Sequence, residues 1–168
     1  MADDDFAEFA TAATAPLLRL GWLLTAHREQ AQDLAQSALV RTFSAWSRIR
    51  HDDALAYARR VLVNLHTDWL RRRPWREQGW LNPPDRPVPT DENGAVEDRL
   101  ALVVALQTLS ARERATIVLR YYADLSEIET AQTLGVSVGT VKSVASRALH
   151  KLRKNPALDG VRLAECAK

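Results

Sequence analysis

The chain has 168 residues, of which 46% are hydrophobic, and its formal net charge at pH 7 is +2. This length allows one or two small domains with a buried core in each, and nothing in it requires a large enzyme fold. The single cysteine, Cys166, excludes an intramolecular disulfide and a zinc site built from several cysteines.

No apolar run approaches the roughly 20 residues that span a bilayer. The acidic start, Asp3 to Asp5 followed by Glu8, is unlike a signal peptide. We therefore expect a soluble protein of the reducing cytoplasm that has no membrane partner.

Apolar residues recur at helical spacing in three stretches of the first 73 residues. In chain order, the three apolar faces consist of Phe6, Phe9, Ala13, Leu17, Leu20 and Leu24; of Ala31, Ala35, Ala38, Thr42, Trp46 and Ile49; and of Leu55, Ala58, Leu62, Leu65 and Trp69. The second helix is expected to begin near Glu29, and the third to run from about Asp53 to Arg73, where Pro74 ends it. Each amphipathic helix needs a partner to cover its apolar face, so we expect one helical unit.

A polar line follows the third helix opposite its apolar face, and it consists of Arg60, Asn64, Thr67 and Arg71. Such a line can follow a nucleic-acid strand, because Asn64 can bind a base edge or the backbone and arginines neutralise phosphates. Tyr57 and Trp69 are rings that can stack on bases, although core packing is the stronger interpretation for Trp69. A solvated helix face with a basic last turn explains the same pattern equally well.

Five of the seven prolines lie between Pro74 and Pro89, so this segment is not helical throughout. The simplest architecture is therefore all-α, with two small helical domains over residues 6–73 and 95–154, joined by a Pro-rich linker over residues 74–94.

The second domain begins with a helical pattern that includes Val96, Leu100, Val103 and Leu106. Ser110 and Glu113 form a capping box that predicts a helix over Arg112 to Tyr122.

A second capping box, Ser126 with Glu129, predicts a short helix that ends near Leu134. Gly135 then supplies a tight turn, and Ser137 can cap another helix that begins at Val138. The pattern indicates a helix–turn–helix over Ser126 to Lys154.

The two faces of the last helix differ in chemistry. One face consists of Val141, Ala145, Ala148 and Leu152, and the opposite face of Ser143, Ser146, Arg147 and His150, flanked by Lys142 and Lys154. The first face is expected to pack against the rest of the domain. The second face contains no acid and can enter a DNA major groove. The alternative is an ordinary helical hairpin with a solvated basic face.

The string SARERATIVLRYYADLSEIETAQTLGVSVGTVKSVASRALHKLRK resembles region 4 of bacterial sigma factors, and it is also similar to the helix–turn–helix of LuxR-type regulators. Upstream, AQDLAQSALVRTFSAW resembles sigma region 2.2. AYARRVLVNLHTDWLRRR resembles regions 2.3 and 2.4 of the extracytoplasmic-function (group 4) sigma factors of the sigma-70 superfamily, especially an actinobacterial sigma-E-like subgroup. LuxR-type proteins have no such segment, and the resemblance covers about residues 6–154.

The resemblance implies a subunit that binds core RNA polymerase, at the β′ clamp and the β flap, and directs promoter-specific transcription initiation. Residues 6–73 would bind the −10 element and aid DNA melting, and residues 95–154 would bind the −35 element. It implies no cofactor, no metal and no bond chemistry, an anti-sigma factor as a further partner, and a place at the nucleoid.

The resemblance also assigns site residues. Polymerase binding falls to Asp33, Gln36, Val40 and Arg41. The −10 contacts fall to the loop residues Arg50, His51 and Asp52, in the segment Arg50 to Asp53 that captures a flipped base, and to Arg60, Asn64, Thr67 and Arg71. The −35 contacts fall to Arg112, Arg114, Thr140, Lys142, Ser143, Ser146 and Arg147.

The sequence departs from the family pattern at three positions. Ser37 stands where the family usually has an acid, Tyr57 where it has a Trp, and Val63 where it has a basic residue before the Asn. The base preference therefore does not transfer. The linker from Glu77 to Arg99 carries six acids, which either mimic RNA or belong to a plain disordered tether.

Two other classes of function remain for comparison. A stand-alone regulator of the LuxR type would bind an operator tightly without polymerase, as a dimer on a two-fold site. An enzyme is disfavoured, because the four histidines are scattered and no HExxH, GxSxG or phosphate loop is present.

Overall fold

The computed structural model describes residues 2–72 and 95–159 of the chain. Within these two ranges the regular structure is helical and no strand occurs, which confirms the all-α prediction. The chain divides into two compact units, residues 1–79 and 80–168. The predicted linker and Cys166 lie outside the described residues.

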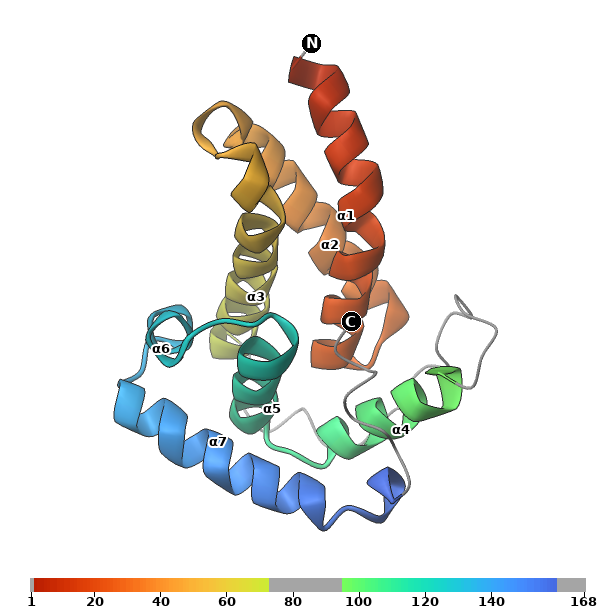
Figure 1. Ribbon diagram of the computed structural model, residues 1–168, viewed down its shortest axis with the longest axis vertical. Coiled ribbons are helices and arrows are strands. Elements are labelled where there is room, and N and C mark those ends of the chain that lie inside the picture. The colour runs from red at the N-terminus through yellow and green to blue at the C-terminus, as the bar shows by residue number, and fades with distance from the viewer. Residues whose placement is uncertain (1, 73–94, 160–168) are drawn as a thin grey trace. The chain divides into compact units, whose positions relative to one another are not determined.

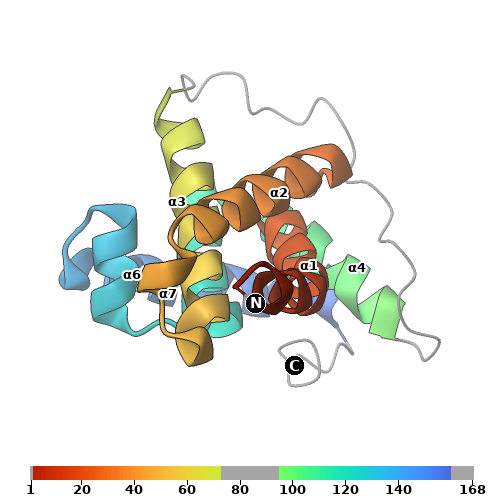
Figure 2. The ribbon, with the colours of Figure 1, turned by 90° about the horizontal axis from the view of Figure 1, so that it is seen from above.

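The first unit is a bundle of three helices, α1 (Ala2–Thr25), α2 (Arg28–Ser44) and α3 (Ala54–Arg72). Each helix packs against the other two (Figure 1), and Figure 2 looks down the axis of α1. The three predicted helices are thus confirmed. Their buried residues include Ala13, Leu17, Leu20, Leu24, Ala31, Ala35, Ala38, Thr42, Ala58 and Leu62.

The backbones of α1 and α2 approach closely because Gly21 has no side chain. A Cβ atom on Gly21 would lie 3.0 Å from the Cα atom and 3.1 Å from the carbonyl oxygen of Ala31. Between the helices, Ala26 adopts the left-handed conformation with φ 59°, and the Thr25 hydroxyl accepts a hydrogen bond from the His27 amide at 3.2 Å. These contacts fix a short connection.

The second helix ends earlier than its apolar pattern predicts. It stops at Ser44, and a 3-10 turn over Trp46–Arg48 follows. Trp46 nevertheless stays buried, because its ring lies 5.1 Å from the ring of Phe6 and 5.0 Å from that of Phe9. The aromatic contacts, and not the helix, hold Trp46 in the core.

The prediction that Thr67 lies opposite the apolar face of α3 is wrong, because Thr67 is only 9% exposed. Val63 and His66 are also buried, whereas Leu65 and Trp69 of the predicted apolar face are half-buried. The reason is that α3 contacts both α1 and α2, and two partners cover a wider face than one.

The second unit contains α4 (Ala95–Gln107), α5 (Ala111–Ile117), α6 (Glu127–Leu134) and α7 (Val138–Arg153). Both α5 and α6 pack on α7, and α4 packs on a short 3-10 turn, Pro156–Leu158 (Figure 1). The helix predicted over residues 112–122 changes to π-helical geometry at Val118–Tyr122.

None of the helices within residues 2–72 and 95–159 is both long and apolar enough to cross a membrane.

Candidate nucleic-acid interface

The helix–turn–helix predicted over residues 126–154 is confirmed, including its caps. The Ser126 amide donates to the Glu129 carboxylate at 2.9 Å, and the Glu129 amide donates to the Ser126 hydroxyl at 3.2 Å. Gly135 has φ 64°, in the left-handed region that favours glycine. Ser137 then accepts a hydrogen bond from the Thr140 amide at 3.1 Å and starts α7.

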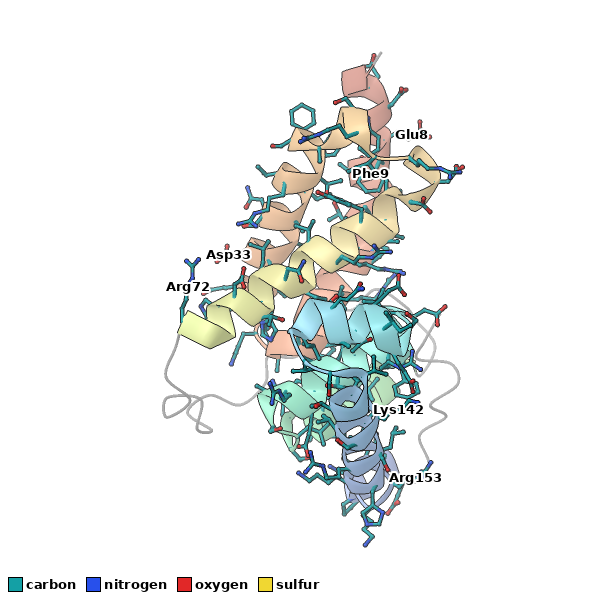
Figure 3. The ribbon with its side chains drawn as sticks, turned by 90° about the vertical axis from the view of Figure 1, so that its left-hand side faces the viewer. Glu8, Phe9, Asp33, Arg72, Lys142 and Arg153 are labelled. Atoms are coloured by element: carbon teal, nitrogen blue, oxygen red, sulfur yellow. The ribbon has the colours of Figure 1, made fainter. Side chains whose placement is uncertain are left out.

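The two faces of α7 separate as predicted. Buried positions are Val141, Val144, Ala145, Ala148 and Leu152, and exposed positions are Lys142, Ser143, Ser146, Arg147 and His150. Figure 3 shows Lys142 near the start of α7 and Arg153 near its end. Because the packed face is complete, the polar face is available to a partner along the length of the helix.

Several of the predicted −35 residues are already engaged within the unit. The Lys142 ammonium lies 3.5 Å from the Glu127 carboxylate of α6. The hydroxyl of Thr140, which is half-buried, lies 2.9 Å from that of Ser137. The Ser143 hydroxyl donates to the Thr140 carbonyl oxygen at 3.0 Å, yet Ser143 remains exposed, as do Ser146 and Arg147.

Arg112 and Arg114, both predicted near the DNA backbone, differ in environment. Arg112 is exposed, whereas Arg114 is half-buried and donates to the Leu109 carbonyl oxygen at 3.4 Å. Burial lowers the pKa of the Arg114 guanidinium to about 10, so it remains charged at neutral pH. Arg112 is therefore better placed than Arg114 to bind a phosphate.

An ion pair joins the cap of α5 to the last turn of α7. The Lys151 ammonium lies 2.8 Å and 2.9 Å from the two oxygens of the Glu113 carboxylate. The carboxylate also accepts a hydrogen bond from the Ser110 amide at 3.0 Å. Burial raises the pKa of the Glu113 carboxyl, but the hydrogen bonds from Lys151 and Ser110 outweigh it and hold the pKa below its usual value.

In the first unit, a pocket of about 490 Å³ opens between the end of α2 and the start of α3. It is lined by Ala45, Arg48, Ile49, Asp53, Tyr57 and Arg60. The pocket borders the segment predicted to capture a flipped base, and it combines apolar walls, a ring and charged groups. The sequence patterns predict no site role for Ala45 or Arg48, which follow the end of α2.

Of the polar line on α3, Arg60 and Asn64 are exposed and Thr67 is buried. The exposed line continues instead to Asp68, one helical turn after Asn64, which shortens the basic track. The side chains of Arg71 and His51 lie outside the described residues, and Arg50 and Asp52 are exposed. Val63 is fully buried, so a basic residue there would be costly.

The face predicted to bind polymerase is exposed on α2 at all four positions, Asp33, Gln36, Val40 and Arg41. Figure 3 shows Asp33 on this helix. Val40 is 59% exposed, and Phe43, one turn further, is 50% exposed. Phe43 was missed from sequence, although its spacing of three from Val40 places it on the same face.

Two family models match the chain. "Sigma-70 region 2" matches residues 14–76, and "Sigma-70, region 4" matches residues 105–154. Two sigma-70 regions in this order define a transcription initiation factor of the sigma-70 type.

Proteins with similar sequences show which subgroup of the sigma-70 type the chain belongs to. The chain is 40% identical over 151 residues to the RNA polymerase sigma-E factor of Streptomyces avermitilis, which covers 89% of this chain and 84% of the relative. It is 32% identical over 139 residues to the ECF RNA polymerase sigma factor SigM of Mycobacterium tuberculosis. That match covers 82% of this chain and 70% of the relative. The chain therefore belongs to the extracytoplasmic-function sigma factors, and it directs promoter-specific transcription initiation with RNA polymerase.

The fold has a counterpart among solved structures. The sigma factor RpoE of Bartonella quintana, determined in complex with the anti-sigma factor NepR, is similar with a TM-score of 0.66 and 22% sequence identity. The match covers 92% of this chain and 98% of that chain.

Proposed function

We propose that residues 95–154 form the −35 binding domain and that α7 enters the major groove of that element. The exposed, acid-free face of α7 carries this proposal, because it places Ser143, Ser146 and Arg147 opposite a fully packed face. Hydroxyl and guanidinium groups match the acceptor-rich edges of bases. Arg112 and Lys142 bind neighbouring phosphates, which requires Lys142 to leave Glu127.

Residues 6–73 form the −10 and polymerase-binding domain in this proposal, and residues 74–94 tether the two domains. The pocket beside Arg50 to Asp53 takes an unstacked base, and Arg60 and Asn64 bind the strand that leads into it. Thr67 has no direct contact, because it is buried.

The exposed residues of α2 bind core RNA polymerase. Val40 and Phe43 supply apolar area, and Asp33 and Arg41 supply charge around it, which suits a partner groove better than bare solvent. An anti-sigma factor that covers the same apolar residues is a further partner. The protein acts at the nucleoid of the cytoplasm and carries out no bond chemistry of its own.

Pull-down with core RNA polymerase, followed by runoff transcription from a matched promoter, tests the proposal. We expect a complex with core polymerase and a defined transcript start. Absence of core binding at low salt would refute the proposal. Tight, polymerase-independent binding to a two-fold operator would favour the stand-alone regulator instead.

Arg147→Ala tests the −35 assignment. We expect a loss of about 1–3 kcal/mol in discrimination between −35 sequences, because a guanidinium that contacts a base edge carries that much specificity. Arg153→Ala, at the exposed end of the same helix, serves as the control that removes one charge outside the assigned face. Equal effects of the two substitutions would contradict the assignment.

A further inference from the structure

An ion pair between α6 and α7 lies at the edge of the exposed face of α7. The Lys142 ammonium is 3.5 Å from Oε2 of Glu127, which belongs to the first turn of α6. Figure 3 shows Lys142 near the start of α7. Since α7 itself contains no acid, Glu127 brings a carboxylate to a face that is otherwise cationic or neutral. This carboxylate lies beside an ammonium group that the proposed function assigns to a phosphate.

The pair between Lys142 and Glu127 is weak and can exchange. Its side chains are 63% and 39% exposed, and 3.5 Å is longer than the roughly 2.7–2.9 Å of a charge-assisted hydrogen bond. By contrast, the Lys151 ammonium lies 2.8 Å from a Glu113 carboxylate whose side chain is only 10% exposed. Because exposed pairs contribute little to stability, Lys142 can leave Glu127 without loss of the fold.

DNA binding brings Lys142 between two anions. In helix–turn–helix proteins the first helix crosses the DNA backbone while the second helix lies in the major groove. The first turn of α6, which carries Glu127, therefore faces phosphates when Lys142 reaches one of them. The Glu127 carboxylate then competes with the phosphate for the ammonium group and also repels the phosphate.

We infer that Glu127 is a negative determinant of DNA affinity, which holds Lys142 in the free protein and opposes the phosphates in the complex. It weakens binding to all DNA sequences alike, because phosphate contacts carry no sequence information. The inference rests on the proposed function of α7 in −35 binding. It adds a residue whose effect on DNA binding is opposite to that of the neighbouring cations.

Weaker intrinsic binding has a consequence for the choice of partner. A genome offers about 10⁶ or more non-specific sites, which a basic helix binds through phosphate contacts. Glu127 lowers the occupancy of these sites, so more of the free chain is available to core RNA polymerase. Once polymerase holds the domain at a promoter, α7 binds at a high effective concentration and needs less affinity of its own.

Glu127→Gln tests the inference in the complete chain, both alone and assembled with core RNA polymerase. The dissociation constant is measured by competition on duplexes that carry either a matched or a scrambled −35 element. We expect the variant to bind both duplexes about three- to tenfold more tightly at low salt. Glu127 lies outside the capping box of Ser126 and Glu129, so α6 keeps its cap, and a gain of affinity cannot come from loss of the fold.

The salt dependence of binding should change together with the affinity. In the wild type, Lys142 displaces a counterion from the DNA but leaves Glu127 to attract one, which reduces its net contribution to the slope of log K against log salt. In Glu127→Gln this contribution approaches the full value of about 0.9 per phosphate. We therefore expect a steeper slope, by up to about 1.

Two further variants separate this mechanism from a change in net charge. Asp159→Asn removes the same charge from an exposed site of the same unit, outside the helix–turn–helix, and should leave the affinity and the slope unchanged. In the background of Lys142→Ala, the gain from Glu127→Gln should fall by at least about half, because the competition for the ammonium group is absent.

Four results would overturn the inference: an affinity that Glu127→Gln leaves unchanged or lowers, an equal gain in Asp159→Asn, a gain confined to one −35 sequence, or a gain that Lys142→Ala does not reduce. A wild-type holoenzyme that does not distinguish the matched from the scrambled −35 element would refute the proposed function itself. A normal distinction between the two, together with an unchanged affinity of Glu127→Gln, would refute only the role of Glu127.

Discussion

At the scale of single residues, Glu113 is the side chain whose charge contributes most visibly to the second unit. It closes the capping box of α5 and binds Lys151 of α7 through both of its oxygens. One carboxylate therefore satisfies the N-terminus of α5 and ties α5 to α7, the second helix of the helix–turn–helix. Removing the Glu113 carboxylate should weaken both the cap of α5 and the contact between α5 and α7.

Glu113→Gln should lower the free energy of unfolding by about 1–3 kcal/mol at pH 7, because charge-assisted hydrogen bonds are lost. The folded-state pKa of Glu113 lies below its usual value of 4.5, so its stabilisation is complete above that value and is lost as the pH falls through the folded pKa. Urea denaturation from pH 7 to pH 3 should show the wild type and the variant converging at low pH.

A matched control is Glu129→Gln, since Glu129 closes the equivalent box of α6 and is more exposed. We expect a smaller loss of stability for this variant. A difference between wild type and Glu113→Gln that stays constant down to pH 3 would show that the charge of Glu113 does not matter.

Single residues also show where sequence reasoning succeeds and where it fails. Ser143, Ser146 and Arg147 were predicted on the exposed face because caps fix the start of α7 and so fix its phase. Thr67 was wrongly predicted to be exposed, because the prediction allowed α3 one packing partner and one apolar face. The helix α3 packs against two helices, and they cover Thr67 as well. The position of Asp53 at a pocket depends on a turn that joins two helices, which periodicity does not describe.

At the scale of elements, the crossing of α1 and α2 depends on Gly21. Gly21→Ala should destabilise the first unit by about 1–3 kcal/mol, because its Cβ atom would meet backbone atoms of Ala31 that cannot turn away. Gly139→Ala is the control, since a Cβ atom there meets only the Ser137 hydroxyl oxygen at 3.9 Å. This second change should be neutral or stabilising by up to about 1 kcal/mol.

Thermal unfolding of the full chain, with hydrogen exchange to assign the change to a helix, measures both effects. Reduced protection should appear in α1 and α2 of Gly21→Ala. A Gly21→Ala variant as stable as the wild type would show that the two helices can separate without cost.

The same scale explains which element boundaries were predictable. The starts of α5, α6 and α7 were predictable, because Ser110, Ser126 and Ser137 cap these helices. The end of α2 at Ser44 was not predictable, since Ala45 is not a residue that stops a helix. The helix ends where the aromatic contacts of Trp46 require a turn. The π-helical change at Val118–Tyr122 likewise has no local residue signal.

At the scale of the whole molecule, the net charge of +2 says little about DNA binding, because the charge is distributed unevenly. Acids gather at the start of α1, where Asp5 and Glu8 are exposed, and Figure 3 shows Glu8 on this helix. The exposed face of α7 carries cations and no acid. Since salt screens charges beyond about 8–10 Å, only cations near phosphates should contribute to affinity.

The salt dependence of promoter binding by the holoenzyme tests this view of the charge. Each phosphate contact contributes about 0.9 to the slope of log K against log salt, so Lys142→Ala combined with Arg112→Ala should reduce the slope by up to about 2. Asp5→Asn combined with Glu8→Gln raises the net charge from +2 to +4, because two negative charges are removed. If the cations assigned to phosphates govern binding, the variant that lacks Asp5 and Glu8 keeps the wild-type slope. If the net charge governed binding, this variant would bind more tightly at low salt, and the variant that lacks Arg112 and Lys142 would bind more weakly by a similar factor.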